Sequence, residues 1–329
     1  MSEETLTLPI AKAITAGLRD AMRADDTVML MGEDIGALGG VFRVTDGLLD
    51  EFGAQRVVDT PLAEAGIVGT ALGLAVRGYR PVVEIQFDGF VFPAFNQITT
   101  QVAKMHYRTG GLVTVPMVIR IPHGGGIGAV EHHSESPEAL FAHTAGLRIL
   151  APATADDAYW LTRQAIESND PVIMLEPKKR YWIKGEVDLD HRPDLADDQA
   201  AIARSGEDVT LVAWGPSVPL ALEAAAAAEE DDIDIEVIDL RSLSPLDIDT
   251  ITGSVRRTGR LVVVHEAPVV GGLGGEIVAR VTEECFYHLE APALRVGSPH
   301  TPYPPARVEH SYLPDLDRVL DAVETTLAH

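Results

Sequence analysis

The feature that most constrains this chain is the alternation of short apolar segments with segments of helical periodicity. In its first half, helical periods cover residues 9–24, 63–77, 92–108, 136–144 and 154–168, and apolar strand candidates cover 27–32, 81–86, 115–122, 147–152 and 171–177. Short apolar strands that alternate with helices indicate parallel strands joined by crossover helices. This half is therefore predicted to be an α/β domain.

A second α/β unit follows a stretch that has no sustained apolar period. Residues 184–203 carry several aspartates among Gly185, His191 and Pro193, which is typical of a solvated linker. Strand candidates then return at 209–214, 233–240 and 261–264, with helical periods through 224–228 and 275–286. We predict a domain over 1–186, a linker over 187–204 and a domain over 205–329, each with a mainly parallel sheet and flanking helices.

The charge balance excludes some partners. The chain has 50 acidic and 26 basic side chains, a formal net charge of −24. Such a surface repels nucleic acid phosphates and anionic membranes, so we expect neither as a partner. The acidity is also compatible with simple solubility or a salt-adapted cytoplasm. With Cys285 as the only cysteine, the chain forms no intramolecular disulfide, and with no visible targeting segment we expect a cytoplasmic protein.

Three glycine-rich stretches, at 36–40, 124–128 and 271–275, invite comparison with phosphate-binding loops. None has the Lys-Ser/Thr ending of a P-loop or the context of a dinucleotide fingerprint, so tight turns and close backbone approach are the simpler explanation. The stretch 124–128 differs because it leads directly to His132 and His133. Histidines suit acid–base chemistry if the loop faces a cleft, but such a pair can also simply precede a helix. Here Ser136 is expected to cap a helix that Pro137 opens.

Glu64 lies near the start of a helical segment that is otherwise almost entirely small and apolar. Two interpretations remain open from the residues alone. The carboxylate can sit near solvent and favour the helix dipole. Alternatively, it is buried and functional, with a raised pKa that makes it a hydrogen-bond donor at neutral pH.

Segments along nearly the whole chain, in order, resemble one family. They are residues 56–76, 84–98, 132–152, 168–178, 208–215, 236–247 and 259–268. These segments are similar to the beta subunit of thiamine-diphosphate-dependent 2-oxoacid dehydrogenases, the decarboxylating component of the pyruvate and branched-chain 2-oxoacid complexes. The resemblance implies a transketolase-like pyrimidine-binding domain followed by a transketolase C-terminal domain, in agreement with the two α/β units.

The resemblance also implies roles for individual residues. Glu64 matches the glutamate that hydrogen-bonds N1′ of the cofactor's aminopyrimidine and favours its imino tautomer. Leu62, Gln86 and Phe90 match positions that contact the pyrimidine half, although relatives often have tyrosine where Phe90 stands. His133 matches the histidine implicated in proton transfer during acyl transfer to the lipoyl group, whereas His132 matches a position that is not histidine in many relatives.

The family's diphosphate and magnesium motif, Gly-Asp-Gly followed by Asn, does not occur in this chain. The resemblance places that motif, with Mg²⁺, on a separate alpha subunit of an α₂β₂ heterotetramer. This chain would then hold the pyrimidine end of thiamine diphosphate, and no magnesium site is expected on it. Some relatives bind a structural potassium ion through backbone carbonyls at positions that match Met117, Ala165, Ile166, Ser168 and Asp170.

The function that the resemblance implies is oxidative decarboxylation of a 2-oxoacid, with acyl transfer to the lipoyl domain of an acyltransferase core. Residues 39–43 and 174–182 look more like the branched-chain type than the pyruvate type, which remains the alternative. A non-catalytic scaffold subunit is a rival from another class, and a nucleotide-linked dehydrogenase is a third. Glu64 and His133 argue against the scaffold, and the missing fingerprint argues against the dehydrogenase.

Overall fold

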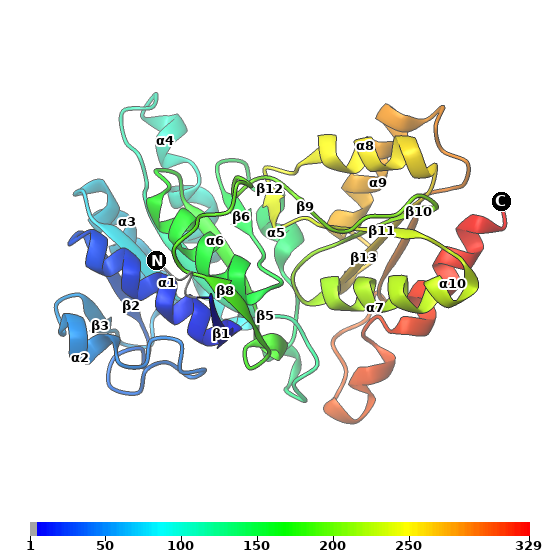
Figure 1. Ribbon diagram of the computed structural model, residues 1–329. Coiled ribbons are helices and arrows are strands. Elements are labelled where there is room, and N and C mark those ends of the chain that lie inside the picture. Colours follow the sequence, from blue (N-terminus) through cyan, green and yellow to red (C-terminus); the bar gives the residue numbers. More distant parts are fainter. Residues whose placement is uncertain (1–4) are drawn as a thin grey trace.

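The computed structural model describes residues 5–329, which form two α/β units side by side (Figure 1). The first unit is built on a seven-stranded sheet with strand order β12-β6-β7-β5-β4-β2-β3. Its strands are β2 (Val28–Gly32), β3 (Val57–Asp59), β4 (Arg80–Glu84), β5 (Val118–His123), β6 (Arg148–Leu150), β7 (Val172–Pro177) and β12 (Ser242–Ser244). All neighbouring pairs except β12–β6 are parallel, which confirms the predicted α/β class.

Helices bury both faces of this sheet. The helices of the first unit are α1 (Ile10–Ala24), α2 (Leu48–Phe52), α3 (Glu64–Val76), α4 (Met105–Arg108), α5 (Glu138–Ala142) and α6 (Ala155–Glu167). Successive residues of one strand serve opposite faces, since Val82 packs with α1 and α6 while Val83 packs with α3. A strand covered on both sides must be apolar at nearly every position, so these strands are continuous apolar runs in the sequence.

The second unit has a five-stranded sheet of order β14-β13-β10-β11-β9, in which only β9 is antiparallel to its neighbour. Its strands are β9 (Ala201–Arg204), β10 (Val209–Ala213), β11 (Ile235–Asp239), β13 (Leu261–Pro268) and β14 (Leu294–Ser298). Its helices are α7 (Val218–Ala228), α8 (Ile248–Thr258), α9 (Leu273–Cys285) and α10 (Leu316–Leu327). In Figure 1, α8 and α9 lie on one side of this sheet and α7 on the other.

The two units share one continuous apolar core, which runs from Val68 of α3 to Ile277 of α9. Strand β12 belongs to the second half of the sequence but pairs with β6 of the first sheet. The preceding Arg241 is 1% exposed, and its Nε donates to Asp157 of α6 over 2.7 Å. The units are therefore joined by packing and by a buried ion pair.

The segment predicted as a linker is partly folded. Strand β8 (Lys184–Asp188) pairs antiparallel with β1 (Thr5–Pro9), and β9 occupies the last residues of the segment. Between the strands, the carbonyl oxygens of Ala196 and Gln199 accept hydrogen bonds from Arg241. The sequence did not predict these strands because they lie at sheet edges. An edge strand is exposed to solvent and can be rich in charged residues such as aspartate, so it lacks the apolar run of a central strand.

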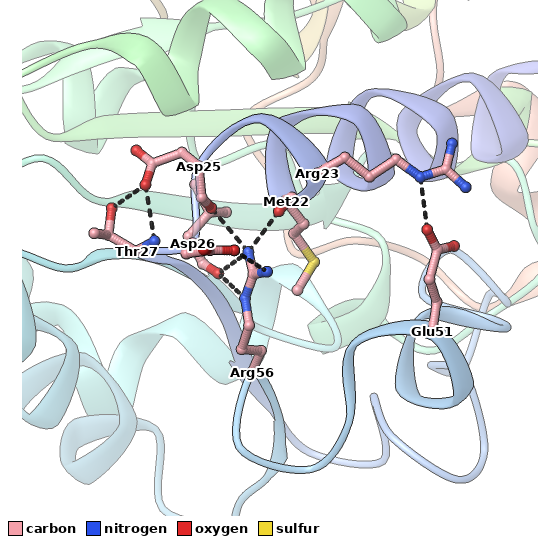
Figure 2. Close-up of polar contacts among 8 residues, drawn as sticks. Met22, Arg23, Asp25, Asp26, Thr27, Glu51 and Arg56 are labelled. Atoms are coloured by element: carbon pink, nitrogen blue, oxygen red, sulfur yellow. Dashed lines mark hydrogen bonds and ion pairs between the residues drawn. The ribbon is translucent and has the colours of Figure 1, made fainter.

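Arg56, which directly precedes β3, is hydrogen-bonded to the residues at the end of α1 (Figure 2). Its guanidinium donates to the carbonyl oxygens of Met22, at 2.7 Å, and Asp25, at 2.8 Å, while Arg23 pairs with Glu51. These bonds hold β3 in place beside β2, and β3 leads directly into the segment that carries Glu64.

The segment 92–108 is not the single α-helix that its apolar spacing predicted. It is divided among a 3₁₀ helix η1 (Asp88–Ala94), a π-helical segment η2 (Gln97–Val102) and α4. The predicted apolar face of the segment is correct, because Ile98 and Val102 are buried. The hydroxyls of Thr99 and Thr100 bond back to carbonyl oxygens four residues earlier, which competes with regular helix bonding.

Two smaller observations complete the fold. The expected Ser136 cap is wrong, since α5 starts at Glu138 and has no side-chain cap. Within residues 5–329, no helix has the length and apolar character needed to cross a membrane.

Candidate functional site

Two strands of the first sheet end together and place polar side chains at one edge. Gly32 of β2 is in register with Glu84 of β4. Glu33 follows β2 directly, and Gln86 comes two residues after β4. The Gln86 amide donates to the Glu33 carbonyl oxygen over 3.3 Å and to Asp34 over 3.1 Å. The carboxyl edge of a parallel sheet is where ligands of α/β proteins bind, so this edge is the first candidate site.

Glu64 is the first residue of α3, and its side chain is 8% exposed. The carboxylate is therefore buried, and it also stands at the N-terminus of the helix, where the dipole favours its charge. Its neighbour Glu33 is 7% exposed, and one carboxylate oxygen of Glu33 has no hydrogen-bond partner within residues 5–329. Burial raises the pKa of Glu33, and the negative charge of Glu64 raises it further. The raised pKa favours the protonated form of the Glu33 carboxyl group, which lies near enough to Glu64 to sense its charge.

Sequence reasoning missed Glu33. The signal was available, because an acid directly after an apolar strand in an α/β pattern lies at the sheet edge where sites form. Only the fold shows that it meets Glu64, which follows a different strand.

Leu62 lies just before α3, and its side chain is 80% exposed. An isolated apolar side chain of this exposure is ordinary, but this one is two residues from the carboxyl pair. It leaves an apolar surface beside a proton-holding site, which suits contact with a flat heterocycle.

His133 and Phe90 belong to an aromatic cluster formed by η1 and the 3₁₀ helix η3 (Glu131–His133). The ring centroids of His133 and Phe87 are 3.9 Å apart with the rings nearly parallel, and Phe90 meets His133 edge-on at 5.0 Å. His133 Nδ1 lies 2.8 Å from the carbonyl oxygen of His132. The other ring nitrogen of His133 is thus left for a ligand, while His132 packs against the rim of the cluster.

A buried ion pair lies against the Phe87 side of this cluster. Lys178 pairs with Asp88, and the Lys178 ammonium lies 5.7 Å from the centre of the Phe87 ring. Asp88 also accepts a hydrogen bond from the backbone N–H of Glu135 over 2.9 Å. Burial lowers the pKa of Lys178 and raises that of Asp88, and each partner's charge opposes the shift. Through the Glu135 N–H, the Lys178–Asp88 pair holds the histidine segment beside Phe87.

The five positions matched to a potassium site lie together near the end of α6 and the start of β5, but a guanidinium already engages two of them. Arg80 donates to the carbonyl oxygens of Ile166 and Ser168, each over 2.9 Å, and to the side chain of Asn169 over 2.8 Å. The Arg80 guanidinium therefore brings to these carbonyl oxygens the positive charge that a potassium ion would otherwise bring. The geometry therefore gives the expected potassium ion no support.

The residues present fit one half of thiamine diphosphate. Glu64 offers a buried carboxyl group, Phe90 an aromatic ring and Leu62 an exposed apolar contact, as a pyrimidine ring requires. For the diphosphate half, residues 5–329 contain no group of three or more His, Cys, Asp or Glu side chains that could hold a metal ion. The observed fit is to the pyrimidine end.

Comparison with known families and proteins agrees with this geometry. Residues 7–183 match the family model of the transketolase pyrimidine-binding domain, and residues 198–319 match that of the transketolase C-terminal domain. A solved structure described as a split-gene transketolase, inactive β₄ tetramer, superposes with a TM-score of 0.80 at 25% identity and covers 98% of both chains.

Curated relatives are similar over almost their full length. The chain is 62% identical to the pyruvate dehydrogenase E1 component subunit beta of Leifsonia xyli, over 98% of this chain and 95% of the relative. It is 54% identical to the 3-methyl-2-oxobutanoate dehydrogenase subunit beta of Mycobacterium tuberculosis, over 99% and 94%. It is 43% identical to the pyruvate dehydrogenase E1 component subunit beta of Bacillus subtilis, over 97% and 98%.

Proposed function

Because the chain belongs to the family of 2-oxoacid dehydrogenase beta subunits, built from transketolase pyrimidine-binding and C-terminal domains, we propose that it completes a thiamine-diphosphate site shared with an alpha subunit. The reaction is oxidative decarboxylation of a 2-oxoacid with acyl transfer to a lipoyl group. The observation that carries the proposal is the buried Glu64–Glu33 carboxyl pair at the carboxyl edge of the sheet.

Glu64 would hold the pyrimidine N1′ and would exchange a proton with it. Glu33 supports this role, because its raised pKa favours a protonated carboxyl group near Glu64. Gln86 holds the Glu33 backbone in place through its amide. When bound, thiamine diphosphate supplies the carbon nucleophile and the electron sink for decarboxylation.

Phe90 and Leu62 bind the faces of the pyrimidine ring. Phe90 keeps the aromatic surface that relatives provide with tyrosine but has no hydroxyl, so its contribution is packing rather than hydrogen bonding. Its edge-on contact with His133 links the cofactor contact to the histidine.

His133 is proposed to transfer a proton during acylation of the lipoyl group. Its stacking on Phe87 and the contact of Nδ1 with the His132 carbonyl orient the ring. An imidazole held in one orientation, with one nitrogen still available, is suited to acid–base work near neutral pH.

The proposed partners provide the parts of the site and of the reaction that the described residues of this chain do not provide. The alpha subunit is proposed to hold the diphosphate and Mg²⁺ in an α₂β₂ heterotetramer, and a lipoyl-bearing acyltransferase is proposed as the acceptor. We further propose the domain division at residues 187–204. We place the chain in the cytoplasm, which fits its single cysteine, the buried Cys285.

Branched-chain 2-oxoacids are the proposed substrates, and pyruvate is the second candidate. The two segments that favour the branched-chain type meet behind the histidine, where Phe42 lies 5.4 Å from Phe87 and 5.1 Å from Tyr181 between ring centroids. This aromatic contact near His133 supports a role for both segments in the acyl pocket. The relative with the pyruvate name has the higher identity, 62% against 54%, and favours the alternative.

Co-expression with an alpha subunit tests the proposal. The purified assembly is assayed for lipoyl-dependent oxidative decarboxylation of 3-methyl-2-oxobutanoate and of pyruvate. A higher kcat/KM for the branched-chain substrate is expected, and a preference for pyruvate would transfer the assignment to the second candidate. If the tetramer assembles but turns over no 2-oxoacid, the proposed activity is wrong and the chain is a non-catalytic scaffold subunit.

A further inference from the structure

The glycine-rich loop 124–128 is shaped to bind an anion. Gly124, Gly126 and Gly128 have positive φ angles of 86°, 81° and 71°, and they alternate with residues of ordinary conformation. Such alternation turns successive backbone N–H groups toward one point. A Cβ at Gly125 would clash with the hydroxyl and ring of Tyr303, so the backbone of the loop passes close against the second unit.

The anion in this loop is a carboxylate of the same chain. Glu309 lies on the 3₁₀ helix η7 (Ala306–Ser311) of the second unit and is 8% exposed. One of its oxygens accepts from the N–H of Gly126 over 2.8 Å, and the other accepts from the N–H of Gly128 over 3.1 Å. The Tyr303 hydroxyl donates to the first oxygen over 2.5 Å. The loop that resembled a phosphate site is thus filled by Glu309.

A second carboxylate of the same unit extends this contact, since Glu266 of β13 accepts from the N–H of Gly125 over 3.0 Å. Burial raises the pKa of Glu266. The Gly125 bond and the nearby Lys179 and Lys178 charges favour its ionised form. The N–H groups of Gly125, Gly126 and Gly128 in the first unit therefore all donate to carboxylates of the second unit.

The other end of the same segment is held within the first unit. The N–H of Gly124 donates to the carbonyl oxygen of Glu135 over 3.0 Å, and the N–H of Glu135 donates to Asp88. His132 and His133 lie between these anchors. The segment is a closed loop whose base belongs to the first unit and whose glycine-rich arm is fixed by the second.

Packing alone does not determine where this loop lies. A cavity of about 200 Å³ separates Ser134 and Ser136 from Glu266 and Tyr303 of the second unit. With free space on this side of the segment, the hydrogen bonds to Glu309 and Glu266 hold its glycine-rich arm, while Asp88 and Phe87 hold the histidine end.

We propose that Glu309, together with Tyr303, is a positioning residue that holds the His133 loop in place for acyl transfer to the lipoyl group. The inference rests on the proposed function for the role of His133. Its physical basis is that a displacement of about 1 Å in an acid–base group can reduce turnover by roughly 10²-fold. The second unit is then part of the catalytic arrangement, although it contributes no side chain to the cofactor contacts proposed above.

The test uses the assembly with the alpha subunit and two variants of this chain. Glu309→Gln keeps the shape but replaces one acceptor oxygen by an amide that cannot accept from a backbone N–H. Tyr303→Phe removes only the hydroxyl bond to Glu309. Glu324→Gln, an exposed glutamate on α10, is the matched control for charge.

In Glu309→Gln we expect a 10- to 100-fold lower kcat with the lipoyl acceptor, an unchanged KM for the lipoyl domain, and decarboxylation with an artificial electron acceptor within about threefold of wild type. Amide hydrogen exchange should rise in residues 124–136 and remain unchanged in α10. Tyr303→Phe should show the same pattern with a smaller loss, and Glu324→Gln should behave as wild type.

Wild-type lipoyl turnover and wild-type exchange in Glu309→Gln would overturn the inference. Equal loss of both half-reactions in Glu309→Gln and Tyr303→Phe would also overturn it, because Glu309 would then act on the whole fold. The exchange measurement is independent of the assignment of function. If the wild-type assembly has no 2-oxoacid activity, the proposed function fails, while faster loop exchange in Glu309→Gln still establishes that Glu309 holds the loop.

Discussion

The imidazole of His133 stacks on the ring of Phe87, with centroids 3.9 Å apart and an interplanar angle of 10°. This contact joins the segment after the glycine-rich loop to the segment after β4, two parts of the chain more than forty residues apart. It places the His133 ring against Phe87, beside the Asp88–Lys178 ion pair, whereas His132 contacts Phe90 and the edge of His133.

Replacing His133 should separate the two half-reactions. His133→Ala is expected to lower lipoyl-dependent turnover by about 10²-fold or more, as the loss of a proton-transfer group does. Decarboxylation measured with an artificial electron acceptor should fall much less, because Glu64 serves that step. His132→Ala is the matched control and should be mild in both assays. An equal loss in both half-reactions would place His133 in decarboxylation, and no loss would make it a histidine that merely precedes a helix.

Glu64→Gln should nearly abolish turnover while the fold is retained. The change is almost isosteric and removes only the ability to exchange a proton, for which a loss of about 10²-fold or greater is expected. Steady-state rates and far-UV circular dichroism of the assembly provide the measurements, with Glu324→Gln as the exposed control. Activity within about threefold of wild type would remove Glu64 from the mechanism.

The isolated chain should not bind thiamine diphosphate with Mg²⁺ at useful affinity. The residues 5–329 provide a pyrimidine contact but no cluster of metal-binding side chains, and Mg²⁺ requires oxygen ligands in addition to the phosphates. Isothermal titration calorimetry of the lone chain and of the co-expressed pair compares the two cases. Micromolar, Mg²⁺-dependent binding to the lone chain would contradict a shared site.

Potassium should have no specific effect on this chain. Arg80 already donates to the carbonyl oxygens of Ile166 and Ser168, so the unfolding temperature of wild type should be the same in KCl and NaCl at equal ionic strength. Arg80→Ala should lose about 1 kcal/mol of stability, because it leaves partly buried carbonyl oxygens without donors. The exposed Arg77→Ala is the control. Stabilisation of wild type by potassium but not by sodium would show that the ion binds after all.

Glu138 should make stability depend on pH. This residue of α5 is 1% exposed, and burial raises its pKa to about 8. The folded chain keeps the carboxyl group neutral, whereas the unfolded chain ionises it above its usual pKa of 4.5. Its contribution is therefore fully present below pH 4.5 and is lost as the pH rises toward 8.

The matched variant is Glu138→Gln, which is neutral at every pH. Between pH 5 and pH 8, wild type should lose on the order of 3 kcal/mol relative to this variant. Thermal unfolding of both proteins across that range measures the difference. Parallel pH curves for the two proteins would mean that Glu138 is ionised in the folded chain.

Much of the fold was predictable because of where its apolar side chains lie. Strands such as β4 and β7, covered by helices on both faces, must be apolar throughout, and the sequence shows them as unbroken runs. Strands β1, β8 and β9 lie at edges and lack this signal, and β12 has only three residues. The division of 92–108 into three helical segments was also hidden, because backbone bonding by Thr99 and Thr100 leaves the apolar spacing intact.

The sequence by itself determined the two α/β units, the buried helix that begins at Glu64, and the resemblance that assigned roles to Glu64 and His133. Only the tertiary structure decided that Glu33 lies near enough to Glu64 to sense its charge, that Arg80 donates to the carbonyls of Ile166 and Ser168, and that Glu309 fills the glycine-rich loop. The physical reason is the range of the interactions. Apolar periodicity reflects local burial, whereas these three polar contacts join residues that are 31, 86 to 88 and 181 to 183 positions apart, and their partners are chosen only when the sheets are assembled.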